Sequence, residues 1–307
     1  MGRQNANTVL MIEPVAFGFN AETEVNNFFQ QRGNHSADQV QLLALVEFNG
    51  MVEQLRSKDI RVIVVKDTIE TYTPDSIFPN NWVTFHEDGS VVVYPVFALN
   101  RRLERRYDII QHVIDSGYKH TKFSDYTCFE NQNYFLEGTG SLIFDHVNRI
   151  VYAALSERTS YEMLLGFCGD FGFTPVIFSA FQTVGQRRLP IYHTNVMLSV
   201  ADNYVVICLD CIDDKEDREN LLESFRKTGK IIISISEKQM NNFAGNMLQL
   251  QNAEGTKYLV LSETAYNSLD NYQLNKLQSF NELIVVPVPT IEQYGGGSVR
   301  CMMAEVF

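Results

Sequence analysis

Five short apolar segments recur along the chain at nearly constant spacing. Each begins with a polar or small residue, and consecutive starts lie 59, 55, 51 and 55 residues apart. The segments are Asn81–Phe85, Gly140–Phe144, Asn195–Ser199, Asn246–Leu250 and Cys301–Glu305. A fixed period indicates a repeated structural unit whose copies bury their apolar faces against one another. This repeat constrains the fold more than any other feature of the sequence.

The residues between these segments repeat as well. A second apolar strand follows each of the first four segments after a short turn, so each pair is predicted to be a hairpin. These second strands are Val91–Tyr94, Ile150–Ala153, Val205–Cys208 and Tyr258–Leu261. No second strand follows Cys301–Glu305, and Thr8–Ile12 is the apolar strand left without a partner. We therefore expect these two segments to pair.

Helical patterns and short third strands complete the unit. The predicted helices are Ser36–Ser57, Arg101–Ser116, Ser160–Phe171, Lys215–Thr228 and Glu263–Phe280. The third strands found in the sequence are Arg61–Val65, Ile231–Ile235 and Glu282–Val286. The order strand, strand, helix, strand, five times over, predicts a closed ring of five α/β modules, which leaves no open sheet edge. We expect one domain, residues 1–307, and not two.

Composition excludes several classes of partner. The 307 residues carry a net charge of −12, and nucleic-acid binding needs a basic surface instead. One basic cluster is present, Arg101, Arg102, Arg105 and Arg106, and its spacing on a helix suggests a solvated face or a single substrate contact. With no run of 18 apolar residues and no signal peptide visible, we predict a cytoplasmic protein without a membrane partner.

The five cysteines are odd in number and irregular in spacing, so they do not indicate a disulfide framework. Cys208 and Cys211 form a C-x-x-C pair that closes an apolar strand. No basic neighbour is in view to activate either thiol, so we interpret this pair as structural. No second such pair accompanies it, which argues against a zinc site.

Cys301 has a different setting, because it follows Gly295, Gly296 and Gly297. Glycines allow a backbone to approach its neighbours closely or to adopt positive φ angles. A thiol placed there is presented at a surface or pocket, unless it is a buried structural cysteine behind a flexible turn. The segment alone does not decide between these two interpretations.

The repeat brings other groups to the same place. Equivalent strands start at the same end of a ring, so residues at those starts converge. Asn81 and Asn195 begin two of the segments, His193 lies two residues before one, Glu137 three before another, and Cys301 begins the last. A thiol, an imidazole and a carboxylate that meet can serve as nucleophile, acid/base and orienting group.

At this point the sequence resembles the amidinotransferase and arginine deiminase superfamily, guanidine-modifying enzymes with a five-bladed α/β-propeller (pentein) fold. The matching motifs are Pro74–Phe78, Asn100–Arg102, Leu136–Gly138, Leu155–Thr159, Tyr192–Asn195 and Gly296–Met302. The resemblance implies that Cys301 is the nucleophile, His193 the general acid/base and Glu137 the third catalytic group. Arg300 is a further candidate for helping to form the thiolate. The expected substrate-binding residues are Asp75, Asn80, Asn81, Arg101, Arg158 and Asn195.

Departures from the family pattern suggest the substrate. By this resemblance, arginine deiminases carry carboxylates at the positions of Asn81 and Asn195, and the family's usual Glu-Gly-Gly-Asp segment has an acidic residue at the position of Gly140. Two amides suit a neutral ureido group, which needs both donors and acceptors, better than a guanidinium. With Phe243–Met247, this makes the chain most similar to the branch that hydrolyses citrulline to ornithine.

The resemblance implies a small-molecule substrate and no metal or organic cofactor, and it leaves a homo-oligomer open. Two alternatives remain. One is a guanidine hydrolase of the arginine deiminase or dimethylarginine type, or an amidinotransferase. The other is a non-catalytic propeller that acts as a binding factor.

Overall fold

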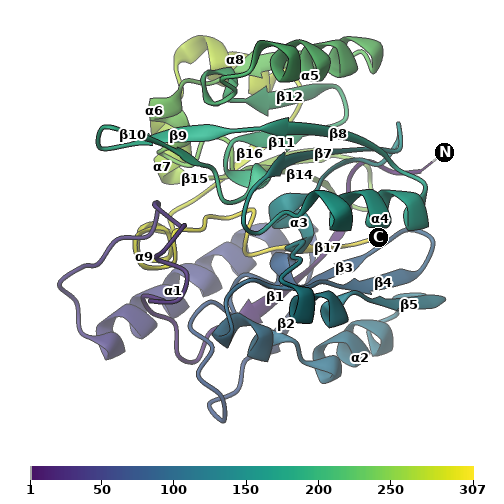
Figure 1. Ribbon diagram of the computed structural model, residues 1–307. Helices are drawn as coiled ribbons and strands as arrows, with labels where there is room; N and C mark the ends of the chain where they lie inside the picture. The colour runs from purple at the N-terminus through teal and green to yellow at the C-terminus, as the bar shows by residue number, and fades with distance from the viewer. Residues whose placement is uncertain (1) are drawn as a thin grey trace.

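The computed structural model describes residues 2–307 and contains five three-stranded units (Figure 1). In each unit the first strand pairs antiparallel with the second, and the second pairs parallel with the third. The first strands are β3 (Val83–Phe85), β6 (Ile143–Asp145), β11 (Leu198–Val200), β14 (Leu248–Gln251) and β17 (Ala304–Val306). The second strands are β4 (Ser90–Val93), β7 (Ile150–Leu155), β12 (Tyr204–Ile207), β15 (Lys257–Ser262) and β1 (Thr8–Glu13). The third strands are β5 (Lys122–Asp125), β8 (Thr174–Ser179), β13 (Ile231–Ser234), β16 (Glu282–Val286) and β2 (Arg61–Lys66).

The fifth unit combines the two ends of the described chain, as the repeat predicts. β17 pairs antiparallel with β1, with Thr8 opposite Val306, and β1 pairs parallel with β2. β17 also pairs with β3 of the first unit, so these two units share one six-stranded sheet (Figure 1). The N-terminal strand therefore completes the unit that the C-terminal strand begins.

Helices connect the second and third strands, and three of the five predicted helices are confirmed with nearly the same bounds. They are α1 (Ala37–Arg56), α4 (Tyr161–Phe171) and α5 (Lys215–Lys227). The start of α1 has a clear local cause, because the Ser36 side chain accepts from the backbone N–H of Gln39 and the Gln39 side chain accepts from that of Ser36. Such a reciprocal cap satisfies two N–H groups that the helix leaves without partners.

The other two predicted helices are wrong as single elements. Glu263–Phe280 divides into α7 (Glu263–Ser268) and α8 (Asn271–Gln278), because Leu269 is extended and Asp270 caps a new helix. Arg101–Ser116 divides into the 3₁₀ helix η2 (Asn100–Glu104) and α2 (Tyr107–Asp115), with extended backbone at Arg105 and Arg106.

The arginine cluster of this region is not a solvated helix face either. Arg101 is buried, and Arg102 and Arg105 form ion pairs with the buried Glu130. Arg106 pairs with Asp108. The charges of these arginines are therefore neutralised by carboxylate partners and do not form a solvent-exposed basic surface.

The starts of the first strands also need correction. Asn81 lies in the 3₁₀ helix η1 (Pro79–Asn81) and Asn195 in η4 (Thr194–Val196), while the third equivalent turn is the one-turn helix α3 (Gly138–Ser141). Each strand begins two or three residues after the polar position that the sequence marks. The polar side chains are thus carried by tight turns at the strand ends.

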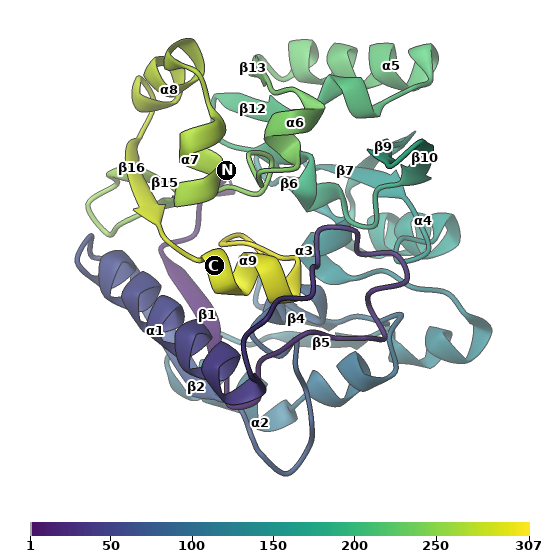
Figure 2. The same ribbon diagram turned by 90° about the vertical axis from the view of Figure 1, so that its left-hand side faces the viewer.

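Four further helical elements and one hairpin complete the described residues. They are the remaining 3₁₀ helices η3 (Thr127–Gln132) and η5 (Leu209–Cys211), the helices α6 (Glu237–Met240) and α9 (Pro289–Gly295), and the hairpin of β9 (Phe181–Val184) and β10 (Arg187–Pro190). The loop between β1 and α1, residues 14–36, has no regular secondary structure and lies beside α9 (Figure 2). In the part of the chain described, no helix is long and apolar enough to cross a membrane.

Candidate active site

The turns before the first strands pack against one another. α3 contacts both η1 and η4, the turn at Gly245 approaches the carbonyl oxygen of Val196, and β17 contacts η1. Arg300, in the last turn, donates its backbone N–H to the Asn246 side chain at 3.0 Å. This ring of turns brings together side chains that are 50 or more residues apart in sequence.

Cys301 lies in this ring and is 4% exposed. Its Sγ accepts hydrogen bonds from Asn195 Nδ2 at 3.4 Å and from Asn246 Nδ2 at 3.3 Å. The glycines before it serve a packing purpose: Gly296 has φ of +62° and ends α9, where a Cβ would lie 2.6 Å from the backbone nitrogen of Gln30. The thiol is therefore buried, but it is held by polar groups at the edge of a pocket.

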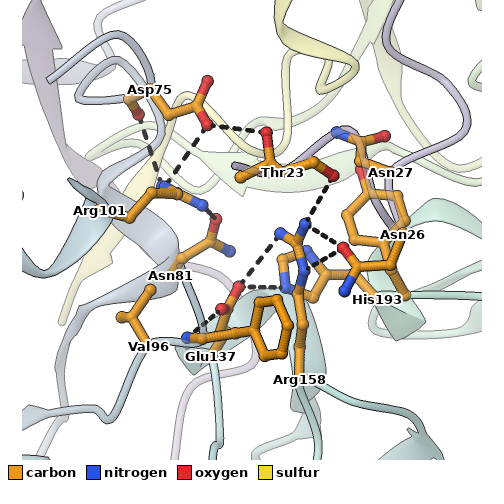
Figure 3. Close-up of polar contacts among 12 residues, drawn as sticks. Thr23, Asn26, Asn27, Asp75, Asn81, Val96, Arg101, Glu137, Arg158 and His193 are labelled. Carbon is orange, nitrogen blue, oxygen red and sulfur yellow. Dashed lines mark hydrogen bonds and ion pairs between the residues drawn. The ribbon is translucent and has the colours of Figure 1, made fainter. Parts of the chain in front are cut away.

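His193 and Glu137 form a buried pair, with 2.7 Å between His193 Nε2 and Glu137 Oε2 (Figure 3). Burial lowers the pKa of His193 to about 4, even though Glu137 acts to raise it. Burial also disfavours ionised Glu137, but Arg158 and the hydrogen bond from His193 outweigh this and lower the pKa of Glu137 to about 2. At neutral pH the pair is thus a carboxylate that accepts the Nε2 proton of a neutral imidazole, which leaves Nδ1 as a free base.

The pocket itself is small, with about 260 Å³ of space outside the protein atoms. Six of the nine predicted site residues line it: Asp75, Asn81, Arg101, Arg158, His193 and Cys301. Glu137 lies behind His193, and Asn195 contacts the sulfur. Asn80 is fully buried outside this lining, so its role in substrate binding stays a prediction.

Arg101 is held by protein groups on every side. Its Nε and Nη2 each lie 2.9 Å from an oxygen of Glu104, and its Nη1 donates to Asn81 Oδ1 at 2.6 Å. Asp75 Oδ2 lies 3.8 Å from Nε of Arg101. Because guanidinium nitrogens can only donate, the Asn81 amide must direct its oxygen to Arg101 and its NH₂ group elsewhere.

Arg158 is bound by the loop between β1 and α1, which sequence reasoning did not include in the site (Figure 3). Asn26 Oδ1 accepts from its Nε at 3.0 Å and also from Nη2, and Glu137 Oε2 lies 3.5 Å from Nη1. The same loop reaches Asp75, whose Oδ2 accepts from Asn20 Nδ2 at 2.7 Å. The only sequence signal for this role is the run of amide residues in an otherwise unassigned segment.

Arg300 does not assist Cys301, contrary to expectation. Its guanidinium donates to the carbonyl oxygen of Met303 and pairs with Glu305, each at 2.9 Å. Both partners lie in the same C-terminal segment, and the Arg300 guanidinium makes no hydrogen bond to the Cys301 sulfur within the described residues.

Several buried polar atoms at the site have no hydrogen-bond partner within residues 2–307. Asp75 Oδ1 and Asn81 Nδ2 belong to the pocket lining, whereas Asn195 Oδ1 and both side-chain atoms of Asn80 lie outside it. Burying such groups without partners costs about 1–3 kcal/mol each. A ligand with matching donors and acceptors would recover that cost.

Five units in a ring, with a cysteine and a carboxylate-bound imidazole at one end, define the pentein class, the amidinotransferase and arginine deiminase superfamily. Within this class, residues 13–307 match the family model described as N,N dimethylarginine dimethylhydrolase, eukaryotic. The chain belongs to that family. No curated protein sequence matches it.

Solved structures share the fold. The N-terminal domain of ArgZ, an arginine dihydrolase from the ornithine-ammonia cycle in cyanobacteria, bound to substrate, is 16% identical with a TM-score of 0.72, and 97% of each chain is covered. AgrE with L-arginine is 16% identical with a TM-score of 0.72, covering 98% of this chain and 40% of that one. A dimethylarginine dimethylaminohydrolase adduct with S-methyl-L-thiocitrulline is 14% identical with a TM-score of 0.64, covering 98% and 99%. The α/β pentein fold predicted from the sequence is confirmed.

Proposed function

We propose that this protein hydrolyses the ureido group of citrulline to give ornithine, with Cys301 as nucleophile. The observation that carries the proposal is the orientation of two amides. Asn81 Oδ1 is committed to Arg101, which leaves the NH₂ group of Asn81 free, while Asn195 Nδ2 faces the sulfur and leaves Asn195 Oδ1 free. The site therefore has one free donor in the pocket lining and one free acceptor on a residue beside the sulfur.

A ureido group matches this pair. Its carbonyl oxygen can accept from the Asn81 NH₂ group, and its own NH₂ can donate to Asn195 Oδ1. A guanidinium has only hydrogen-bond donors, so one of its N–H groups would face the NH₂ group of Asn81, and neither could accept a hydrogen bond from the other. A site that forces a buried donor against a donor rejects that ligand by at least about 100-fold.

The amino-acid end of the substrate has binding groups further along the pocket. Asp75 Oδ1 is buried without a partner and can accept from an α-ammonium group. Arg158 can pair with the α-carboxylate once Asn26 Oδ1 moves from its Nε and Nη2. Arg101 orients Asn81 and does not bind the substrate α-carboxylate. Its contacts support this role, because Glu104 already accepts from its Nε and Nη2.

The reaction proceeds in two halves. The proton of the Cys301 thiol passes to His193 Nδ1, the thiolate forms a bond to the ureido carbon, and the bond to the ornithine nitrogen breaks as His193 returns the proton to that nitrogen. His193 then takes a proton from water, whose oxygen attacks the S-carbamoyl carbon. The C–S bond breaks and releases carbamic acid, which decomposes to carbon dioxide and ammonia. The Asn81 NH₂ group donates to the oxygen where negative charge develops.

The second candidate is hydrolysis of dimethylarginine, and the family match favours it. A direct test measures ornithine, citrulline and ammonia released from citrulline, arginine, agmatine and dimethylarginine. We expect ornithine from citrulline and rates at least about 100-fold lower for the guanidines. Turnover of dimethylarginine to citrulline, without further conversion of citrulline, would support the second candidate and overturn the first.

A further inference from the structure

Asn246 lies in the turn before β14 and is fully buried. It occupies the same place in its unit as Asn81 and Asn195 do in theirs. Neither the sequence motifs nor the proposed reaction assigns it a role. Its contacts make it a neighbour of the reacting sulfur.

The side-chain amide of Asn246 is fixed in one orientation. Its Oδ1 accepts the backbone N–H of Arg300 at 3.0 Å, and a backbone N–H can only donate. The opposite end, Nδ2, therefore points to Cys301 Sγ at 3.3 Å and to the backbone oxygen of Asn195 at 3.0 Å. Both donors of the NH₂ group are used, and one of them is used on the sulfur.

Asn195 is the second donor to the sulfur, and it is held less firmly. Its Oδ1 has no partner within the described residues, and the proposed substrate complex would use that oxygen. Within residues 2–307 the sulfur accepts from no other side chain. Asn246 is thus the donor whose orientation the protein itself fixes, with or without substrate.

We propose that Asn246 is a further catalytic residue, which stabilises the thiolate form of Cys301 through its fixed N–H donor. Hydrogen bonds to an ionised acceptor are about twice as strong as those between neutral groups, so this contact favours the anion over the thiol. The inference rests on the proposed function in that Cys301 is the nucleophile, but it does not depend on which substrate the protein hydrolyses.

A merely structural role, in which Asn246 only anchors the Arg300 segment, predicts a different result on substitution. Asn246→Asp keeps an oxygen for the Arg300 N–H, removes the donor to the sulfur and adds a negative charge beside it. Asn246→Ser adds no charge and leaves only a shorter hydroxyl, which stands about one bond length further from the sulfur than Nδ2 does. Asn252→Asp is the matched control, because its Oδ1 already accepts from the backbone N–H groups of Glu254 and Thr256 just beyond the other end of β14.

The experiment measures the rate of alkylation of Cys301 by iodoacetamide from pH 5 to 10, by mass spectrometry of the cysteine peptide. We expect Asn246→Asp to move the pH midpoint upward by at least about one unit, which corresponds to roughly tenfold slower alkylation below the midpoint. Asn246→Ser should move it in the same direction by less, and Asn252→Asp should leave it unchanged.

An unchanged midpoint in either Asn246 variant, with native circular dichroism, would overturn the proposal, and Asn246→Ser supplies this test if Asn246→Asp does not fold. The proposed function fails in a different way. If wild-type protein with Cys301 fully alkylated still hydrolyses its substrate, Cys301 is not the nucleophile, whatever the midpoints show.

Discussion

Two regions enclose the pocket, and they are built differently. The ring of turns carries Glu137, His193 and Cys301 on segments that continue directly into sheet strands and pack on one another through backbone contacts. The loop at residues 14–36 is tied to the pocket largely by side-chain amides, such as Asn20 on Asp75 and Asn26 on Arg158. The groups that we propose to react are therefore preorganised, whereas the groups proposed for the amino-acid end of the substrate have partners that can be exchanged.

The largest effect is expected from Glu137→Gln in the ring. The substitution removes the negative charge that holds the Nε2 proton of His193, so Nδ1 is no longer kept as the free base. We expect kcat to fall by about 10³-fold with KM little changed, in the range of general acid–base catalysis. Steady-state kinetics provide the measurement, and an equal rise in KM would show that the carboxylate binds substrate instead.

A second test of the ring is Gly140→Ala. A Cβ there would lie 2.5 Å from Asn81 Nδ2 and 2.8 Å from His193 Nδ1, and both groups are held by Arg101 and Glu137. We expect activity to fall by about 100-fold while the fold is kept, because small displacements of reacting groups have effects of that size. Gly166→Ala is the control, since a Cβ at this helix position meets no atom within 4 Å.

The buried imidazole of the ring also predicts a pH dependence of stability. Because burial lowers the pKa of His193 from 6.5 to about 4, the unfolded chain binds more protons than the folded one between these values. Stability is therefore complete above pH 6.5 and is lost as pH falls toward 4, by about 2 kcal/mol for this group between pH 7 and pH 5. Denaturant unfolding at both pH values should show a smaller loss for His193→Gln, and an identical loss would contradict the assignment.

The loop should respond more weakly and in a different parameter. Asn26→Ala removes the acceptor that the substrate α-carboxylate has to displace from Arg158. We expect KM for citrulline to fall by about tenfold, equivalent to one hydrogen bond to a charged group, with kcat within about threefold of the original value. A fall in kcat with KM unchanged would place Asn26 with the reacting groups and break the distinction between the two regions.

Much of the fold could be predicted because the repeat shows itself in short apolar segments and helix caps, which depend on residues close in sequence. Apolar segments such as Val205–Ile207 and caps such as Ser36 act through near neighbours, and the lone strand Thr8–Ile12 had one place to pair. The break between α7 and α8 was not predicted, because the helical pattern of apolar residues continues across it. The Asp270 side chain nevertheless caps a new helix there.

The predicted site comprises only residues that belong to sequence motifs or to repeated positions. Cys301, His193 and Asn81 could be predicted because they stand at or near repeated positions, whereas the direction of Arg300 and the contacts of Asn26 depend on packing between distant segments. The orientation of the Asn81 amide could not be predicted from the sequence either, since it is set by the hydrogen bond that Arg101 donates to its oxygen.

In the proposed complex, Arg101 turns the Asn81 amide so that the pocket offers a donor to a ureido oxygen. The ratio of kcat/KM for citrulline to that for dimethylarginine tests this in the wild-type protein and in Asn81→Asp, where the free group becomes an acceptor. We expect a ratio above about 100 in the wild type and a fall of at least about tenfold in the variant. A ratio below one in the wild type, or a ratio that the substitution leaves unchanged, would contradict it.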